Sequence, residues 1–359
     1  MPEKLPQCLI RVDASESIGT GHIMRCLALA TELTHCGNKV SFVMALCPEL
    51  LKKRIADEGQ NVCILPAEIE PGSEVDARFT AQLAADLTAT RMIVDGYHFL
   101  TSYQRLLKAA KLELLYIDDL AHCDYYCADI VLNQNPSASQ SLYPNCEAHT
   151  SLLLGADYLL LRSEFLAYKK TNQNGEIAPL AKKILVTLGG GDIDNVTARA
   201  MEALAQAPGE LALEVTVVIG AANGHTDWLQ NFAHKLNAKG GHRFNTRVNA
   251  RDMPELLGAN DLVISAGGTT VWEAAYLGRP TAVIITADNQ RVGMEHFAEQ
   301  GAVKLLGRQQ DLASGTLSET LVHLIKDTKE RERLASRAAS LIDGQGARRV
   351  IQKLSAQTI

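Results

Sequence analysis

Residues 261–273, DLVISAGGTTVWE, decide the fold that we expect for this chain. A short apolar run, DLVIS, leads into two glycines and two threonines, and a helical stretch follows. Strand–turn–helix units of this kind build parallel α/β sheets, whose strands are buried on both faces and read as continuous apolar runs. The second half of the chain contains four further runs of the same type, ILVTLGGG (184–191), LEVTVVIG (213–220), TAVIITA (281–287) and VKLLG (303–307). We therefore predict one α/β domain here.

The first half of the chain repeats this alternation. Helical stretches separate its apolar runs, for example HIMRCLALATELTHCG (22–37), which ends at a glycine. The expected strands are CLIRV (8–12), VSFVM (40–44), VCILP (62–66), MIVDG (92–96), LLYID (114–118), DIVLN (129–133) and SLLLG (151–155). The order of elements predicts a second doubly wound, Rossmann-like sheet.

The length of 359 residues suits two domains of ordinary size. The polar stretch YKKTNQNGEIAPLA (168–181) contains Gly and Pro and is the expected linker. The predicted domains are thus 1–167 and 182–359, and the second includes two final helices at 327–342 and 344–355. Two open α/β domains joined by one linker predict a cleft that binds a ligand.

Composition excludes several classes of protein. Hydrophobic residues make up 47% and charged residues 21%, which is a globular balance. The formal net charge of −6 argues against a nucleic-acid partner that binds by bulk charge. No apolar run approaches the ~18 residues that a membrane helix needs, so we expect no stable membrane insertion. The N-terminus lacks the pattern of a signal peptide, which predicts a cytoplasmic protein. The eight cysteines of the chain are therefore expected to be reduced thiols.

The sequence Gly-Thr-Gly-His (19–22) follows the first strand and opens a helix. The positive end of a helix opposes protonation of His22, and a neutral imidazole is what a general base requires. The alternative is a histidine that caps the helix or packs on the sheet edge. The spacing alone leaves both interpretations open.

Glycine-rich turns follow two strands of the second domain. The first, Gly189-Gly190-Gly191 followed by Asn195, fits phosphate binding and a structural turn equally well. At the second, 265–273, backbone N–H groups, hydroxyls and a helix start converge, which suits a diphosphate, and an acidic residue one turn into the helix can accept hydrogen bonds from ribose hydroxyls. The alternative is a threonine N-cap with a glutamate that stabilises the first turn. The residues concerned are Asn195, Gly267, Gly268, Thr269, Thr270 and Glu273. The pattern is not that of a nucleoside-triphosphatase P-loop.

Polar residues follow other strands as well. Asn289 and Gln290 come after the run 281–287 and can read sugar hydroxyls, although an ordinary helix cap fits equally well. Aspartates end the runs 92–96 and 114–118 and suit acid–base work, metal binding or simple capping. We also considered a zinc site made of His122, Cys123 and Cys127. A C-x3-C pair without a matching second pair is only a weak indication of a zinc site.

Taken in order along the chain, these segments resemble one known family. They are RVDAS…IGTGHIMRCLALA (11–30), VDGY (94–97), IDDL (117–120), LLGADYLLLRSEF (153–165), VTLGGGDIDNVT (186–197), SAGGTTVWEAAYLGRP (265–280), ADNQ (287–290) and DGQGARRV (343–350). They are similar to the UDP-sugar hydrolases of pseudaminic acid biosynthesis, which remove UDP from UDP-2,4-diacetamido-2,4,6-trideoxy-β-L-altropyranose. More distantly, they resemble the GlcNAc transferase of peptidoglycan synthesis, which has the GT-B fold.

The resemblance implies a GT-B-like fold and a hydrolysis at the anomeric carbon with inversion, without a metal or another cofactor. It makes His22 the base that activates water, with Gly21 in the same loop. The positions that match substrate-binding segments are Asp13, Tyr97, Asn195, Gly267, Gly268, Thr269, Thr270, Glu273, Asn289 and Gln290. The partner would be the UDP-linked diacetamido sugar, and the product would enter a glycan on flagellin or the cell surface.

Three alternatives stay open at this stage. A GT-B glycosyltransferase would use the same UDP-binding residues but an acceptor hydroxyl in place of water. A hydrolase of a related nucleotide sugar would have the same motifs. A nucleotide-sugar binding or scaffolding protein would bind the nucleotide sugar without releasing UDP. The sequence does not set the oligomeric state.

Overall fold

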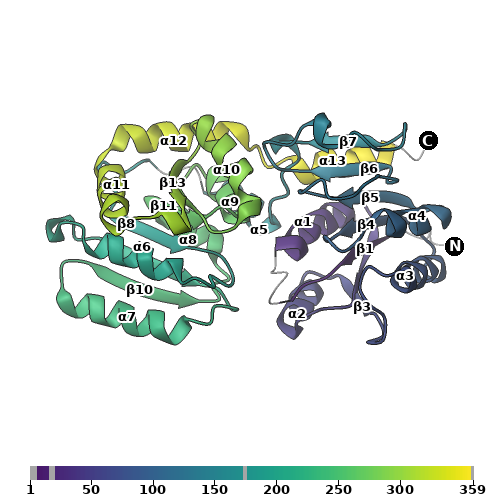
Figure 1. Ribbon diagram of the computed structural model, residues 1–359, viewed down its shortest axis with the longest axis horizontal. Helices are drawn as coiled ribbons and strands as arrows, with labels where there is room; N and C mark the ends of the chain where they lie inside the picture. The colour runs from purple at the N-terminus through teal and green to yellow at the C-terminus, as the bar shows by residue number, and fades with distance from the viewer. Residues whose placement is uncertain (1–5, 16–20, 173–175, 357–359) are drawn as a thin grey trace. The chain divides into compact units, whose positions relative to one another are not determined.

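The computed structural model describes residues 6–15, 21–172 and 176–356. The chain folds as two compact units (Figure 1). Unit 1 comprises residues 1–163 and 344–359, and unit 2 comprises residues 164–343. These bounds differ from the predicted domains at the end of the chain, because residues 344–359 belong to unit 1. The predicted linker also begins inside a helix, α5, which spans Ser163–Thr171.

Unit 1 contains one parallel sheet with helices. Its strands are β1 (Gln7–Val12), β2 (Lys39–Met44), β3 (Asn61–Ile64), β4 (Ala89–Asp95), β5 (Glu113–Ile117), β6 (Ile130–Asn133) and β7 (Ser151–Leu154). Its helices are α1 (Gly21–His35), α2 (Glu49–Asp57), α3 (Glu74–Asp86), α4 (Thr101–Ala109) and α13 (Gly346–Ala356), with short 3-10 turns η1 (Gln140–Leu142) and η2 (Ala156–Tyr158). All seven predicted strands are present, each within a few residues of its expected bounds.

The sheet of unit 1 has the order β3-β2-β1-β4-β5-β6-β7. Its order reverses between β1 and β4, which pair in parallel with Val12 opposite Asp95. In open α/β sheets, ligands bind beyond the carboxyl ends of the strands at such a reversal. The sequence around Val12 and Asp95 is therefore where a site is expected in this unit.

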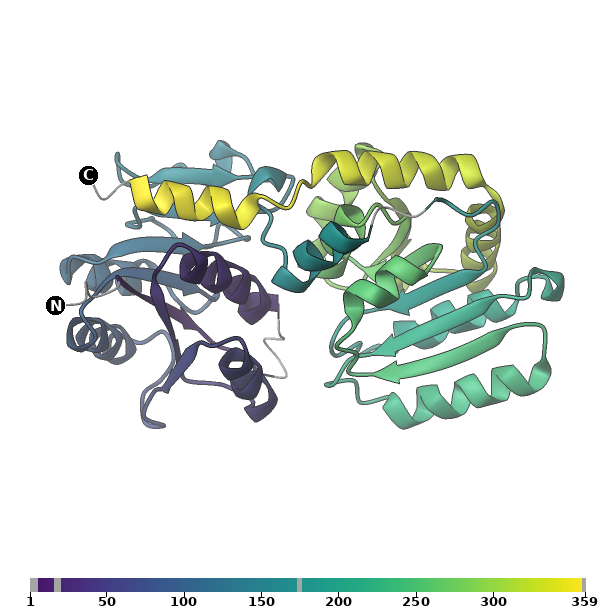
Figure 2. The ribbon, with the colours of Figure 1, turned by 180° about the vertical axis from the view of Figure 1, so that it is seen from behind.

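The last helix of the chain completes the core of unit 1. The helix α13 packs against α1, and Figure 2 shows the two side by side in yellow and purple. Val350, Ile351 and Leu354 of α13 are buried in the same apolar cluster as Ile23 and Leu27 of α1. The prediction that this helix belongs to the second domain is wrong, because its apolar face covers the first sheet.

Unit 2 contains a second parallel sheet. Its strands are β8 (Lys183–Thr187), β9 (Glu214–Ile219), β10 (Arg243–Val248), β11 (Leu262–Ala266), β12 (Thr281–Ile285) and β13 (Lys304–Arg308). Its helices are α5, α6 (Val196–Ala205), α7 (Thr226–Lys239), α8 (Met253–Ala259), α9 (Thr269–Tyr276), α10 (Asp288–Glu299), α11 (Ser314–Lys326) and α12 (Thr328–Leu341), with 3-10 turns η3 (Gly209–Leu211) and η4 (Gln309–Asp311).

The sheet of unit 2 has the order β10-β9-β8-β11-β12-β13, so its reversal lies between β8 and β11. The stretch DLVIS forms β11, as predicted, and runs directly into the turn before α9. The edge strand β10 was not predicted. Of its side chains only Phe244 is buried, and so its sequence shows no apolar run.

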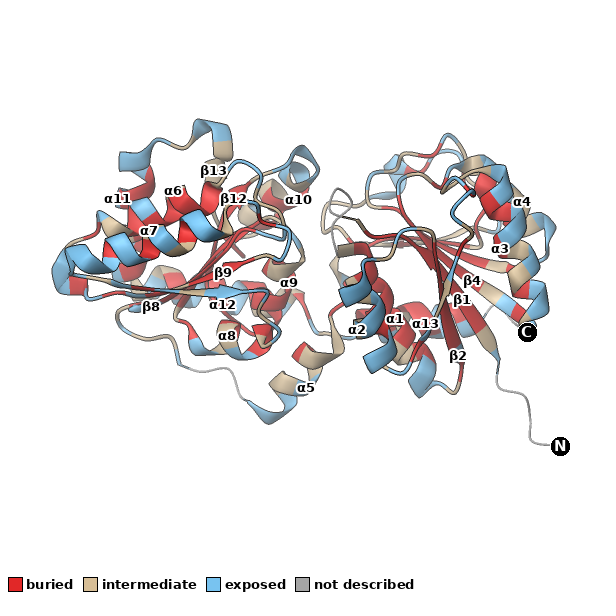
Figure 3. Cartoon of the chain, turned by 90° about the horizontal axis from the view of Figure 1, so that it is seen from below, coloured by how far each residue is buried: buried red, intermediate tan, exposed pale blue. Residues whose placement is uncertain are grey.

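Burial follows the two sheets. In Figure 3 the central strands are red along most of their length, for example β1, β4, β8 and β11, whereas the edge strand β10 is mostly exposed. All eight cysteines lie in unit 1 and are free thiols. Among the described residues, no helix combines the length and the apolar character that crossing a membrane requires.

Candidate functional site

The reversal in unit 1 gathers titratable side chains. Asp13 follows β1, Asp95 ends β4, and His22 stands in the first turn of α1. Gly21 begins that helix, and a Cβ atom added to it would meet nothing within 4 Å. Gly19 and Thr20, the first half of the predicted loop, lie outside the described residues. The part of the loop that is described thus places His22 where the topology predicts a site.

His22 is hydrogen-bonded to a buried aspartate. Its Nδ1 atom lies 2.7 Å from Oδ1 of Asp95, whose side chain is fully buried. Arg25 donates from Nε to Oδ2 of Asp95 at 2.6 Å and from Nη2 to Oδ1 at 2.5 Å. Burial by itself would raise the pKa of Asp95, but the charge of Arg25 and the contact with His22 outweigh it and hold that pKa well below the usual range. Asp95 is therefore ionised.

Two further residues adjoin this group. Arg25 donates from Nη1 to Oδ2 of Asp119 at 2.8 Å. Oδ1 of Asp119 is buried and has no hydrogen-bond partner within the described ranges. The ring of Tyr97 stands edge-on to His22, with 5.0 Å between the ring centres, and 38% of the residue is exposed. Burial and the nearby Asp119 raise the pKa of Tyr97. The predicted residues His22 and Tyr97 are therefore neighbours.

A second histidine–aspartate pair follows β5. Nδ1 of His122 lies 3.0 Å from Oδ1 of Asp118. The hydrogen bond to Asp118, together with one to Cys123, raises the pKa of His122 to about 10. Asp118 also accepts the Tyr126 hydroxyl and three backbone N–H groups, those of Leu120, Ala121 and His122. His122 is thus a cation whose counter-charge is fixed by the surrounding chain.

The same corner contains potential metal ligands. Ligand atoms of Asp118, His122 and Cys123 lie within 4.8 Å of one another, while the third residue of the zinc set we considered, Cys127, is not in this group. The oxygens of Asp118 already accept five hydrogen bonds, so this carboxylate can orient His122 but has little capacity left for a metal. His122 and Cys123 alone fall short of the four ligands that a structural zinc site uses.

Asp13 is committed to neighbouring groups in its own unit. Its Oδ1 accepts the backbone N–H groups of Ala45 and Leu46 at 2.7 and 2.9 Å. Its Oδ2 lies 2.8 Å from Nη1 of Arg11 and 3.1 Å from Nε2 of His98. These contacts tie the carboxyl end of β1 to that of β2. Asp13 thus fixes the backbone that follows β2, and its contact with a substrate stays a prediction.

In unit 2 the first glycine turn follows β8. Gly189 has a φ of +93°, which favours glycine. Gly190 lies against Gly220, where an added Cβ would come within 2.3 Å of the Gly190 carbonyl oxygen. Asp192 caps α6 by accepting the N–H groups of Val196 and Thr197 at 2.8 and 2.9 Å. The turn is therefore held close to the end of the neighbouring strand β9.

Asn195 occupies the N-cap position of α6 with a φ of +52°, but its side chain does not cap the helix. Its Oδ1 atom is buried and has no hydrogen-bond partner among the described residues. Asp192 supplies the cap instead. Asn195, predicted to bind the nucleotide, is thus left with a spare acceptor beside the glycine turn.

The second glycine turn follows β11. Gly268 occupies the N-cap position of α9, so no side chain at that position covers the first backbone N–H groups. Thr269 and Thr270 are the first residues of the helix and are partly exposed, and Glu273, one turn later, is buried. The predicted alternative of a threonine N-cap is wrong. A helix start without a side-chain cap suits an anion.

The amide of Gln290 fixes this turn. Its Oε1 atom accepts the backbone N–H of Gly267 at 3.2 Å, and from Thr286 it accepts both the N–H at 3.0 Å and the hydroxyl at 3.2 Å. Gln290 therefore joins the carboxyl ends of β11 and β12. Asn289 beside it is exposed in the first turn of α10. The structure thus brings Gln290 to the predicted glycine turn, in a supporting position.

Arg25 was not predicted from the sequence, and Asp95 was one of several aspartates without an assigned role. The available signal was the spacing of three between His22 and Arg25, which puts both on one face of a helix.

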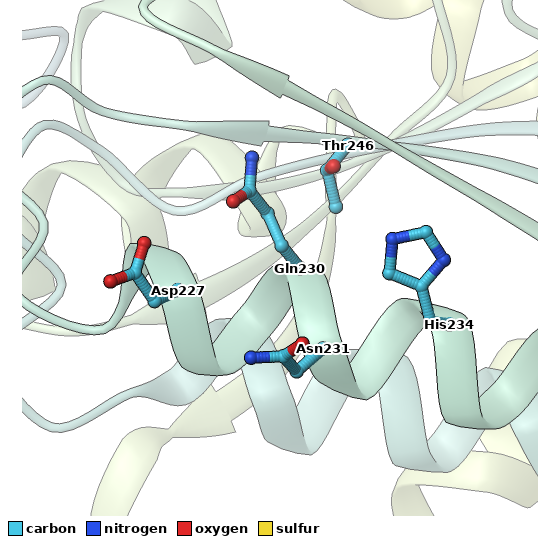
Figure 4. Close-up of a pocket in the computed structure, with 5 residues that line it drawn as sticks. All are labelled: Asp227, Gln230, Asn231, His234 and Thr246. Carbon is cyan, nitrogen blue, oxygen red and sulfur yellow. The ribbon is translucent and has the colours of Figure 1, made fainter.

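The structure also contains a pocket that the sequence did not predict, at the edge of unit 2 that α7 and β10 form. It is lined by Asp227, Gln230, Asn231 and His234 of α7 and Thr246 of β10 (Figure 4). It contains none of the predicted residues.

Residues 184–354 match the family described as the glycosyltransferase family 28 C-terminal domain. An uncharacterized protein of Methanocaldococcus jannaschii is 26% identical over 285 residues, which are 79% of this chain but only 56% of that protein. The chain thus spans little more than half the length of this curated relative. The UDP-2,4-diacetamido-2,4,6-trideoxy-β-L-altropyranose hydrolase of Campylobacter jejuni is 25% identical over 304 residues, which are 82% of this chain and 96% of that enzyme.

Among solved structures, the crystal structure of MurG from Acinetobacter baumannii superimposes with a TM-score of 0.65. It covers 98% of this chain and 99% of its own, with 16% sequence identity. An identity this low shows the fold alone. Together with the two parallel sheets, it establishes a GT-B-like fold, as the sequence predicted.

Proposed function

We propose that this protein is a nucleotide-sugar hydrolase that releases UDP from UDP-2,4-diacetamido-2,4,6-trideoxy-β-L-altropyranose or a close relative of it. The observation that carries the proposal is the hydrogen bond between His22 and buried Asp95 at a helix start. The similarity to the Campylobacter jejuni hydrolase over 82% of the chain supports the choice of substrate.

In the proposed reaction, Nε2 of His22 takes a proton from water as the water oxygen bonds to the anomeric carbon. The bond between that carbon and the phosphate oxygen breaks, and UDP leaves with the electron pair. Attack opposite the leaving group inverts the anomeric centre. UDP is a good leaving group, so the enzyme chiefly has to aim one water molecule and hold the diphosphate.

The residues of unit 2 would hold the nucleotide. Backbone N–H groups at Gly267 and Gly268 and the hydroxyls of Thr269 and Thr270 suit the diphosphate, because they meet the positive end of α9. Glu273 would accept hydrogen bonds from the ribose. The remaining predicted contacts are Asp13, Gly21, Tyr97, Asn195, Asn289 and, through its support of Gly267, Gln290.

A glycosyltransferase is the second candidate, and the match of residues 184–354 to the family 28 domain favours it. Incubation of the purified protein with the UDP-diacetamido sugar alone separates the two. UDP release without an acceptor supports the hydrolase, release only with an added acceptor supports the transferase, and binding without release supports a scaffolding role.

The His22→Ala variant tests the base. We expect UDP release at saturating substrate to fall at least 10²-fold, since general base catalysis contributes about 10²–10⁴. The affinity for UDP should stay within twofold of the wild type. Full turnover by this variant would overturn the role of His22.

A further inference from the structure

Asp95 has the contacts expected of a group that fixes the proton on His22. Nδ1 of His22 lies 2.7 Å from Oδ1 of Asp95. Nη2 of Arg25 also lies 2.9 Å from Nδ1 and could donate to it only if Nδ1 had no proton, but this Nη2 already donates to Oδ1 of Asp95 over the shorter distance of 2.5 Å. A ring nitrogen without a proton at 2.7 Å from an ionised oxygen would bring two lone pairs together. A protonated Nδ1 instead donates to Asp95, and the other nitrogen, Nε2, is then free to accept a proton.

Arg25 determines which of the two groups carries that proton. If Asp95 were protonated, it would donate to Nδ1, and the hydrogen of the neutral ring would move to Nε2. The two hydrogen bonds from Arg25 at 2.6 and 2.5 Å occupy both oxygens of Asp95 and favour its ionised form. The arrangement therefore selects the ring form with the proton on Nδ1 and an unprotonated Nε2.

Asp119 completes the group by holding Arg25 from its other side at 2.8 Å. With neutral His22, the two aspartates and Arg25 carry one net negative charge. Proton transfer from water to Nε2 makes the group neutral. In a buried setting, where charges interact strongly, this stabilises the imidazolium that forms in the transition state.

We propose that Asp95 is the positioning residue of His22: together with Arg25 and Asp119 it holds the imidazole with the proton on Nδ1 and presents Nε2 to the water. This inference rests on the proposed function in one respect, the use of Nε2 as the base. The state of the ring itself can be measured without any substrate.

The direct measurement is the ¹⁵N–¹H correlation spectrum of the histidine rings in the full-length protein, with the His22 signals assigned by their absence in His22→Ala. We expect the wild type to show a protonated Nδ1 and an unprotonated Nε2, and Asp95→Asn to show a mixture or the opposite form. A wild-type spectrum with the proton on Nε2 overturns the proposal, even if Asp95→Asn does not fold.

Kinetics give the second measurement. Asp95→Asn should lower kcat for UDP release about 10²–10⁴-fold, the range for loss of general base catalysis, with UDP affinity unchanged within twofold. The double variant His22→Ala/Asp95→Asn should be no slower than His22→Ala alone, since the two residues act as one unit. An additive loss in the double variant contradicts a positioning role.

Glu113→Gln is the matched control. Glu113 pairs with Arg91 at 2.9 Å across the same two strands, β4 and β5, but at their opposite ends. Its loss removes one carboxylate from an ion pair in the same sheet, so it should lower thermal stability without changing kcat. If Asp95→Asn and Glu113→Gln reduce kcat equally, Asp95 is merely structural. If the wild type releases no UDP, the proposed function fails, whereas the ring form is still measured.

Discussion

The two sheets reverse their strand order in the same way but offer different chemistry there. At the reversal of unit 1, the described groups are buried ionised side chains, above all Arg25 and Asp95. At that of unit 2 they are glycine turns and the uncapped start of α9. Side-chain charges bind and move protons, whereas backbone N–H groups hold an anion without titrating. The same topology thus places two different kinds of chemical group at the two reversals, and the formal net charge of −6 reveals neither kind.

The comparison extends to one fully buried arginine in each unit. Arg11 in unit 1 pairs with the carboxylates of Asp13 and Asp76 at 2.8 Å each. Arg331 in unit 2 donates to backbone carbonyls of Leu324 and Ile325 at 2.6 Å each. Unit 1 therefore relies on charge pairs inside its core, and unit 2 on backbone partners. The following predictions test this difference, from the largest effect to the smallest.

The largest effect is expected at Asp76, which accepts from Arg11 twice and also from Tyr103, Thr80 and the Gly72 N–H. Asp76→Ala leaves a buried guanidinium without this partner and should lower the free energy of unfolding by about 3–5 kcal/mol. Urea denaturation measures it. The control is Asp261→Ala in unit 2, whose Oδ2 accepts the two exposed N–H groups of Lys182 and Lys183 and should cost about 1 kcal/mol. Equal losses of unfolding free energy in the two variants would contradict the view that unit 1 depends more on buried charge pairs than unit 2 does.

The second prediction concerns the backbone of unit 2. Gly220→Ala places a Cβ 2.3 Å from the Gly190 carbonyl oxygen, so the first glycine turn has to move. We expect UDP affinity to fall about tenfold, which equals about 1.4 kcal/mol, and calorimetric titration measures it. Gly209→Ala is the control, because its nearest contact would lie at 3.7 Å. Unchanged affinity in Gly220→Ala would show that the turn does not touch the nucleotide.

The smallest effect is expected from the His122–Asp118 pair in unit 1, because 18% of the His122 side chain is exposed and solvent screening reduces what the pair contributes to stability. The folded-state pKa of His122 is raised to about 10, so its contribution to stability is full below the ordinary value of 6.5 and is lost as the pH rises through 10. Urea denaturation at pH 6, 8 and 10 should show this decline in the wild type. His122→Gln should show a flatter profile over the same range. Identical slopes would mean that the pair does not stabilise the unit.

Much of the fold is predictable from the sequence, because twelve of its strands are apolar runs with polar turns between them. The edge strand β10 has no such run, since one of its faces is solvated and only Phe244 is buried. The helix 344–355 is predictable, yet its amphipathic pattern does not say which sheet it covers. The apolar periodicity of a helix indicates which of its faces is buried, but it does not indicate which element that face packs against.

The site divides in the same way. His22 and the glycine turns are recognisable because their position after a strand and before a helix is local information. The pairing of His22 and Arg25 with Asp95 joins residues about seventy positions apart, which one sequence does not reveal. Gln290 shows the converse, because its type and position fit a ligand contact while its oxygen supports the Gly267 turn.

The position of α13 also bears on how the chain is made. The strands of unit 1 are synthesised before unit 2, but Val350, Ile351 and Leu354 fill its core, so that core stays open until α13 has left the ribosome. Unit 2 is one continuous segment and is complete earlier. At roughly 5–20 residues per second, unit 1 waits on the order of 10–40 s for its final helix. Of the two units, the one whose synthesis begins first is therefore completed second, and the apolar face of α1 is the surface that needs protection in the meantime.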